Sequence, residues 1–279
     1  MPLAESVERW AAVLGSPISH SLSPVLHRAA YAALGLNWTY RAIECAEDDL
    51  AGLLAGADAG VAGFSCTMPL KRRLLELADT ASPRARAIGA GNTLLPRPDG
   101  WHAENTDVDG IRAALAERDV PAGGQVLLLG AGGTAQAALA ALDPDAQVTV
   151  LIRDPSRAGP LRQTADRLAV PVTVAALSDL PERLAAADLV LSTLPPGAAD
   201  PLVGVPGWRA GQALLDVVYA DWPTPLARVA AQAGAVTVSG ASMLLFQAVR
   251  QVELMTGSAA PVAAMRAALR AAAGPGCTA

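Results

Sequence analysis

The segment Gln125–Gln136 constrains the fold of this 279-residue chain more than any other segment. A fully apolar strand leads directly into the glycines of Gly130–Gly133, and an alanine-rich helix is expected at Ala135–Leu142. A second apolar strand follows at Gln147–Ile152. Strand, glycine turn and helix in immediate succession are typical of the first half of a dinucleotide-binding βαβ unit. The sequence therefore predicts an α/β domain with a parallel sheet, beginning near residue 107.

The glycine turn has a chemical interpretation and a plain structural one. Gly130 would make the turn, Gly132 would let the backbone approach a pyrophosphate, and Ala135 takes the place of the third glycine. The helix N-terminus would stabilise the phosphate charge. A turn that serves only the path of the chain is the alternative, but the flanking strands favour the cofactor. The predicted cofactor-binding residues of this turn are Gly130, Ala131, Gly132, Gly133, Thr134 and Ala135.

The residues after the second strand bear on the choice between NADP and NAD. Arg153 is placed to stack on adenine, and Arg157 is placed to pair with a phosphate. Asp154 favours a free ribose hydroxyl instead, or is simply the cap of the next helix. We predict NADP and leave NAD open.

Composition excludes several classes of protein. A net charge of −5 without a basic run argues against nucleic acid, and no apolar run reaches the length of a membrane-spanning helix. Met1–Trp10 lacks the layout of a signal peptide. Cys45, Cys66 and Cys277 have no metal-like spacing, and three scattered histidines are too few for a metal site. We therefore expect a cytoplasmic protein with reduced thiols, no metal and no membrane or nucleic-acid partner.

Apolar patterning and turn residues also predict elements outside the glycine turn. The expected strands are Trp10–Gly15, Trp38–Ile43, Val61–Cys66, Thr93–Pro96 and Trp101–Glu104. The expected helices are Pro24–Leu34 with Ser23 as N-cap, Asp48–Ala57, Leu70–Ala78, Asp109–Arg118 and Pro261–Ala273, and Gly274–Ala279 is expected to be a frayed tail.

The chain contains 21 lysines and arginines together, and Lys71 is the single lysine. A guanidinium stays protonated and cannot relay a proton, whereas an ammonium can. A lysine retained where all other cations are arginine therefore suggests a position where arginine would not serve. Codon bias is the alternative.

Uncharged polar groups gather in the first hundred residues. Ser21 and Ser23, at a helix entrance, are suited to a small carboxylate. Asn92 and Asn105–Asp107 stand at strand ends and are suited to vicinal hydroxyls. Capping and turn formation are the competing explanations.

The ordered motifs together resemble the shikimate dehydrogenase family from about Val13 to Thr256. They are Ser21-x-Ser23-Pro24, Thr67-x-Pro69-x-Lys71, Asn92-Thr93, Asn105-Thr106-Asp107, Gly130–Gly133, Tyr219 with Thr224-Pro225-Leu226, and Gly240–Ala248. This resemblance implies an α/β fold of two domains with the active site in the cleft. A three-layer α/β substrate domain would be formed by residues 1–106 and 241–279, and an inserted Rossmann domain that binds NAD(P) by residues 107–240. The implied reaction is the reversible reduction of 3-dehydroshikimate to shikimate, in aromatic amino acid biosynthesis.

The resemblance also implies residue roles. Lys71 and Asp107 would be the catalytic pair, with Lys71 either a proton relay or an electrostatic anchor. The implied substrate ligands are Ser21, Ser23 and Tyr219 for the carboxylate, and Thr67, Asn92, Asp107 and Gln247 for the ring hydroxyls. Further cofactor contacts are implied for Val217, Gly240 and Met243, the last near the nicotinamide.

The sequence departs from the family at three places. Ser65 and Cys66 stand where the family commonly has Asn-Val, and Cys66 is expected to fill the core. Ser192–Leu194 replaces the usual Asn-Ala-Thr, and Ile152–Asp154 replaces Asn-Arg-Thr. One alternative is a relative that acts on quinate or aminoshikimate, and the small Ser23 disfavours quinate. Another is a catalytically silent NADP-binding regulator, which the retention of Lys71 and Asp107 disfavours. The expected oligomeric state is a monomer or homodimer.

Overall fold

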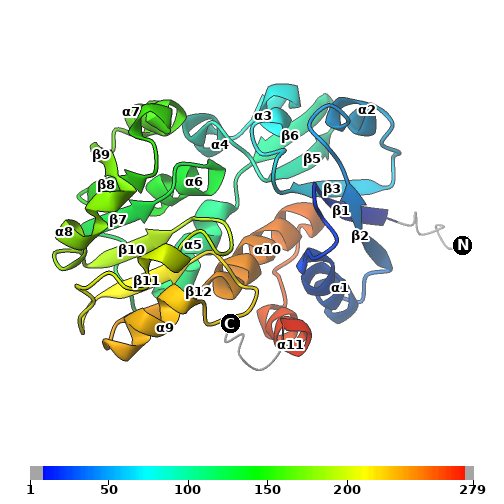
Figure 1. The fold of residues 1–279 in the computed structure, drawn as a ribbon. Coiled ribbons are helices and arrows are strands. Elements are labelled where there is room, and N and C mark those ends of the chain that lie inside the picture. The colour runs from blue at the N-terminus through cyan, green and yellow to red at the C-terminus, as the bar shows by residue number, and fades with distance from the viewer. Residues whose placement is uncertain (1–8, 274–279) are drawn as a thin grey trace, which may run out of the picture. The chain divides into compact units, whose positions relative to one another are not determined.

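The computed structural model describes residues 9–273, and these form two compact units (Figure 1). The first unit comprises residues 9–86, Ala90–Thr106 and Ala248–Ala272. The second comprises Ala87–Gly89, Asp107–Gln247 and Ala273. The first unit is therefore built from both ends of the described chain, and the second is inserted between them.

A mixed six-stranded sheet organises the first unit, in the order β2-β1-β3-β5-β6-β4. β1 pairs in parallel with β2 and β3, whereas β5 runs antiparallel to β3 and β6. Every residue of β3 is buried, as expected of an apolar strand covered on both faces. The strands are β1 (Arg9–Gly15), β2 (Trp38–Glu44), β3 (Val61–Cys66), β4 (Thr80–Ala81), β5 (Thr93–Arg97) and β6 (Gly100–Glu104). The helices are α1 (Ser23–Ala33), α2 (Leu50–Ala55), α3 (Arg73–Leu77), α4 (Pro83–Ile88, whose last residues join the second unit) and α11 (Val262–Ala273).

The sheet of the second unit is entirely parallel, in the order β12-β11-β10-β7-β8-β9. With β7 counted as the first strand, this is the strand order of a Rossmann fold. The chain order reverses at β7, so the carboxyl end of β7 is the topological switch point where such sheets bind ligands. The strands are β7 (Gln125–Leu129), β8 (Gln147–Ile152), β9 (Val172–Ala176), β10 (Leu189–Ser192), β11 (Ala213–Asp216) and β12 (Val236–Ser239).

Helices cover both faces of this parallel sheet. Leu127 and Leu129 of β7 share a core with Leu184 of α8 and Leu226 of α9. The helices α5, α6 and α7 pack against one another in sequence. The helices of the unit are α5 (Asp107–Ala116), α6 (Gly133–Ala141), α7 (Gly159–Leu168), α8 (Leu180–Leu184), α9 (Pro225–Gln232) and the start of α10 (Gly240–Thr256), with 3₁₀ turns at Pro155–Ala158, Leu177–Asp179 and Asp200–Leu202.

Two local predictions are wrong. The N-cap of α1 is Leu22, and Ser23 is the first helical residue. The backbone N–H of Ser23 donates to the Ser21 hydroxyl (3.3 Å). The helix predicted at Leu70–Ala78 is confined to Arg73–Leu77, because the residues before it form turns. Cys277 and the predicted tail Gly274–Ala279 lie outside the described residues.

Candidate functional site

The glycine turn at the end of β7 is required by sterics. Gly130 has a φ of +106°, and a Cβ there would lie 2.6 Å from the Oγ1 of Thr193. That hydroxyl donates to the carbonyl of Leu129 (2.8 Å), so it is held in place against the turn. Thr193, one of the departures from the family, therefore has a structural role at this turn.

The N-terminus of α6 is open to a ligand. Its N-cap is Gly132, with extended backbone and no side-chain cap. A Cβ on Gly132 would meet nothing within 4 Å, and Gly133, Thr134 and Ala135 begin the helix. Backbone N–H groups at a helix start that carry no side-chain cap fit a pyrophosphate.

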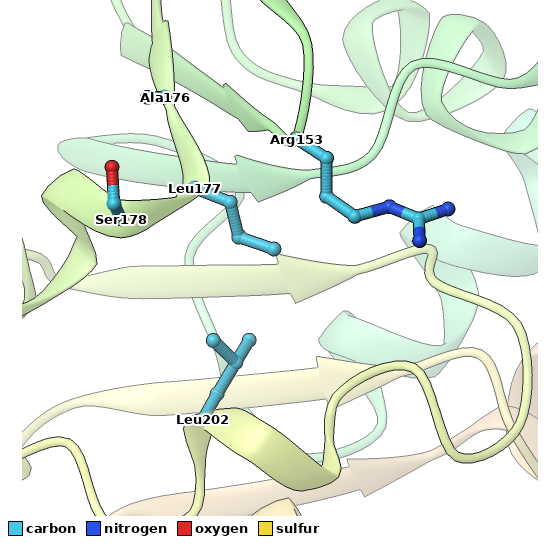
Figure 2. Close-up of a pocket in the computed structure, with 5 residues that line it drawn as sticks. All are labelled: Arg153, Ala176, Leu177, Ser178 and Leu202. Atoms are coloured by element: carbon cyan, nitrogen blue, oxygen red, sulfur yellow. The ribbon is translucent and has the colours of Figure 1, made fainter.

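Arg153 lines a cavity of about 300 Å³ beyond the end of β8. Figure 2 shows its guanidinium extending from the strand end, while Leu202 points towards Leu177. Ala176 and Ser178 complete the lining. Apolar walls with one cationic side chain suit a planar heterocycle such as adenine.

Asp154 caps the 3₁₀ turn that follows β8. Its Oδ1 accepts from the backbone N–H of Ser156 (3.0 Å) and from the Ser156 hydroxyl (2.6 Å). These bonds lower the pKa of this exposed carboxyl, so it is ionised at neutral pH. Arg157 lies in the same turn and favours the same charge state.

A buried carboxylate organises the loop after β11. Asp216 accepts from the Thr224 hydroxyl (2.8 Å) and from the backbone N–H of Val218 (3.2 Å), and burial raises its pKa. Tyr219 lies in the same loop, half-buried. Asp216 is not among the residues predicted from the sequence, although an acidic residue that ends an apolar strand is a usable signal.

Gly240, Met243 and Gln247 lie on the first turns of α10. A Cβ on Gly240 would collide with the carbonyl of Val217, so the structure brings these two predicted cofactor residues together. Met243 and Gln247 are buried, and the backbone of Gly110 in α5 packs against both.

The lone lysine stands in the turns that follow β3 in the first unit. The carbonyl of Thr67 accepts from the backbone N–H of Leu70 (2.9 Å). The carbonyl of Lys71, which is half-buried, accepts from the backbone N–H of Gly91 (2.8 Å). The residue after Gly91 is Asn92, so the lysine backbone is fixed next to a predicted substrate ligand.

Asn92 and Thr106 are hydrogen-bonded to one another. The Oδ1 of Asn92 accepts from the backbone N–H of Thr106 (2.8 Å), and its Nδ2 donates to the Thr106 hydroxyl (3.0 Å). Asn105 donates to the carbonyl of Ala90 (2.9 Å). Asp107, the first residue of α5 and also buried, follows directly.

The loop Ser16–Leu22, which precedes α1, is fixed by a carboxylate that is not among the predicted site residues. Glu44, at the end of β2, accepts from the Ser16 hydroxyl (2.6 Å) and from the backbone N–H of Ile18 (3.1 Å). Ser21 follows half-buried, and Ser23 is buried. No local pattern marked Glu44, because its partners lie 28 and 26 positions away.

Ser65 and Cys66, the departures in β3, are both buried. The Ser65 hydroxyl accepts from Tyr40 (2.7 Å) and donates to Gln251 (2.8 Å). Burial raises the pKa of the Cys66 thiol far above its ordinary value, which suits a core residue and not a redox-active one.

Together, a Rossmann strand order, a glycine turn at its switch point and an open helix N-terminus define a dinucleotide-binding α/β protein. Within residues 9–273, no group of three or more His, Cys, Asp or Glu side chains could hold a metal ion. In the same range, no helix has the length and apolar character needed to cross a membrane.

Comparison with known proteins identifies the family. Residues 13–94 match the shikimate dehydrogenase substrate-binding domain, and residues 240–270 match the shikimate 5'-dehydrogenase C-terminal domain. Shikimate dehydrogenase (NADP(+)) of Halobacterium salinarum is 44% identical, over 93% of this chain and 97% of its own. The chain belongs to the shikimate dehydrogenase family.

Solved structures agree with this assignment. The Mycobacterium tuberculosis shikimate dehydrogenase superposes with a TM-score of 0.84 at 42% identity, covering 94% of this chain and 99% of its own. The Thermus thermophilus shikimate 5-dehydrogenase, solved with NADP(H) and shikimate, superposes with a TM-score of 0.83 at 32% identity, covering 95% and 99%. Both confirm the predicted fold class.

Proposed function

We propose that this protein catalyses the reversible, NADP(H)-dependent reduction of 3-dehydroshikimate to shikimate. The observation that carries the proposal is the fixed arrangement around Asn92. The amide of Asn92 is hydrogen-bonded to Thr106, which precedes Asp107. Gly91, the residue before Asn92, is hydrogen-bonded to the backbone of Lys71. An amide, a carboxylate and an ammonium are the groups needed to hold vicinal hydroxyls and to move a proton at one of them.

We propose that Lys71 and Asp107 act at the oxygen that interconverts between carbonyl and hydroxyl. In reduction this oxygen gains negative charge and a proton, and in oxidation it loses a proton. The ammonium of Lys71 stabilises the charge and relays the proton, and the carboxylate of Asp107 orients the ammonium. Ser21, Ser23 and Tyr219 hold the substrate carboxylate. The ring hydroxyls are held by Thr67, Asn92, Asp107 and Gln247.

The cofactor residues that we propose lie in the second unit. The turn Gly130–Ala135 holds the pyrophosphate, Arg153 stacks on the adenine, and Arg157 pairs with the 2'-phosphate. Val217, Gly240 and Met243 line the place of the nicotinamide, which supplies or accepts the hydride when bound. We assign residues 1–106 and 241–279 to the substrate-binding domain and residues 107–240 to the dinucleotide-binding domain, with Asp107 and Tyr219 of the second range also serving the substrate and Met243 of the first also serving the cofactor. We also propose a cytoplasmic monomer or homodimer.

A second candidate, a relative that uses NAD and accepts quinate or aminoshikimate, is favoured by one observation. Asp154 is ionised at the end of β8, where a carboxylate suits a free ribose hydroxyl. The deciding assay follows reduced nicotinamide by absorbance with shikimate, quinate and aminoshikimate, each with NADP and with NAD. We expect the highest kcat/KM with shikimate and NADP. Turnover with none of the six pairs would rule out an enzyme of this class and leave a silent NADP-binding regulator.

A further inference from the structure

A continuous chain of buried hydrogen bonds crosses the first unit and ends at Asn92. The Tyr40 hydroxyl donates to Ser65 (2.7 Å), which donates to the Oε1 of Gln251 (2.8 Å). The Nε2 of Gln251 donates to the Oγ1 of Thr93 (3.0 Å), and that hydroxyl donates to the Oδ1 of Asn92 (2.9 Å). The five residues come from β2, β3, β5, the residue before β5, and α10.

Every bond in this chain runs in the same direction. Each hydroxyl between the two ends accepts one bond and donates one, and the Gln251 amide accepts at its oxygen and donates at its nitrogen. All five side chains are at most 3% exposed, so water does not compete for these groups. The network therefore turns the Oδ1 of Asn92 towards the Thr93 hydroxyl, while the Nδ2 of the same amide donates to the Thr106 hydroxyl.

Gln251 is the member that joins the two strands. Ser65 and Thr93 are register partners across the antiparallel pair β3 and β5. Their hydroxyls bond to the two ends of the Gln251 amide, which reaches in from α10. The same Nε2 also lies 3.3 Å from the carbonyl of Asn92. A serine at position 65 has no amide of its own, and Gln251 supplies one between the strands.

We propose that Gln251, together with Ser65, is a positioning residue for substrate binding. It orients the amide of Asn92 through Thr93 and does not itself touch the substrate. The inference rests on the proposed function, in which Asn92 holds a ring hydroxyl of shikimate. Loss of the Gln251 amide would leave the Thr93 hydroxyl without its buried donor and loosen the bond from Thr93 to the Oδ1 of Asn92. The bonds with Thr106 would remain, so the Asn92 amide would be held less firmly and would bind that hydroxyl more weakly.

The first test is Gln251→Leu, which removes the amide and keeps an apolar side chain of similar size. We expect the KM for shikimate to rise by about 5- to 10-fold, the scale of one buried hydrogen bond. The KM for NADP should change little, whereas the midpoint of thermal unfolding should fall, because the buried hydroxyls of Ser65 and Thr93 lose their partner. An unchanged KM for shikimate, or equal increases in both KM values, would overturn the inference.

A matched pair of tyrosines controls for the loss of a buried hydroxyl. Tyr40 is the first donor in the series of buried hydrogen bonds. The buried Tyr31 hydroxyl lies outside that series, against the sulfur of Met255 at 4.0 Å. Tyr40→Phe should raise the KM for shikimate by about 2- to 3-fold, and Tyr31→Phe should not change it. This pair decides the question if Gln251→Leu fails to fold, since equal effects of the two substitutions would contradict the inference.

Exchange of the amide between strand and helix gives a rescue test. Gln251→Ala should raise the KM for shikimate, and adding Ser65→Asn should restore it to within about 2-fold, because the cross-strand neighbour Thr93 is within reach of an asparagine. No rescue would mean that the amide is not the functional group. Failure of the wild-type protein to oxidise shikimate would overturn the proposed function itself, whereas normal wild-type turnover with unaffected variants overturns this inference alone.

Discussion

The two units present their polar groups by different means. The second unit offers backbone N–H groups at a glycine turn and an open helix start, around Gly130 and Gly132. The first unit offers side-chain amides and hydroxyls that are buried and bonded to one another, as at Asn92 and Gln251. A phosphate needs only exposed backbone and positive potential, whereas a polyhydroxylated ring needs donors and acceptors of fixed orientation. The difference suggests that small changes among the buried amides and hydroxyls of the first unit affect substrate binding and chemistry, and that changes at the glycine turn of the second unit affect cofactor binding.

The largest expected effect tests chemistry in the first unit. Lys71→Ala should lower kcat for shikimate oxidation by at least about 100-fold and change KM little, because a general acid/base acts mainly in the transition state. Steady-state kinetics at saturating NADP measures both parameters. A kcat within a few-fold of the wild type would remove Lys71 from the catalytic pair.

Lys71→Arg separates charge from proton transfer. An arginine keeps the positive charge but cannot relay a proton at accessible pH. We expect its kcat to stay close to that of Lys71→Ala. Near-normal turnover in Lys71→Arg would show that charge alone suffices.

The second effect concerns the stability of the first unit at low pH. All three histidines of the chain lie in this unit. Burial lowers the pKa of His27 from 6.5 to about 4, and its ring stacks on Tyr40 at 4.0 Å. The folded state binds the proton less readily than the unfolded state, so stability present above pH 6.5 is lost as the pH falls towards 4. We expect the first unit to be about 2 kcal/mol less stable at pH 5 than at pH 7 from this group. Peptide-resolved hydrogen exchange at both pH values measures each unit separately.

His27→Phe is the control for this acid effect. It keeps a ring against Tyr40 and removes the titrating group, at the cost of the bond between Nδ1 and the carbonyl of Ser23 (3.0 Å). The variant should be less stable at pH 7 but lose less stability on going to pH 5. An unchanged difference between the two pH values would assign the acid effect to other groups.

The same contrast explains which features were predictable from the sequence. The cofactor turn is contiguous, and its glycines are required locally, so Gly130–Gly133 and the flanking strands were predicted nearly to the residue. The buried network was not, because Ser65 and Gln251 are 186 positions apart. Ser65 was noted as a departure from the family, but nothing in its own segment indicated that its partner is Gln251. Ser23 was mistaken for an N-cap because a serine before proline has the same local pattern whether the helix begins at it or after it.

In the second unit, the paired glycines give the third prediction. Gly132→Ala places a methyl group in open space where the pyrophosphate is expected, so the KM for NADP should rise by about 10-fold with a stability loss below about 1 kcal/mol. Gly130→Ala should instead destabilise the fold by roughly 1–3 kcal/mol, through its positive φ and the contact with Thr193. Calorimetric unfolding and NADP titration together distinguish the two. A Gly132→Ala variant with normal NADP affinity would place the phosphates elsewhere.

The smallest effect concerns the choice of cofactor at the end of β8. Asp154→Asn preserves a residue that can cap the turn at Ser156 and removes a negative charge located beside Arg157. The ratio of kcat/KM with NADP to that with NAD should rise, because the carboxylate of Asp154 repels a 2'-phosphate. The rise should be only about 3-fold, because this repulsion is weak in water. Asp145→Asn is the matched control, since Asp145 precedes β8 and lies at the opposite end of that strand. The NADP-to-NAD ratio of each variant should be measured at low ionic strength and again in about 0.5 M salt, where the difference between Asp154→Asn and the wild type should shrink. If the ratio falls instead, the carboxylate of Asp154 helps to hold the NADP-binding loop in shape, and its capping bonds to Ser156 outweigh its charge.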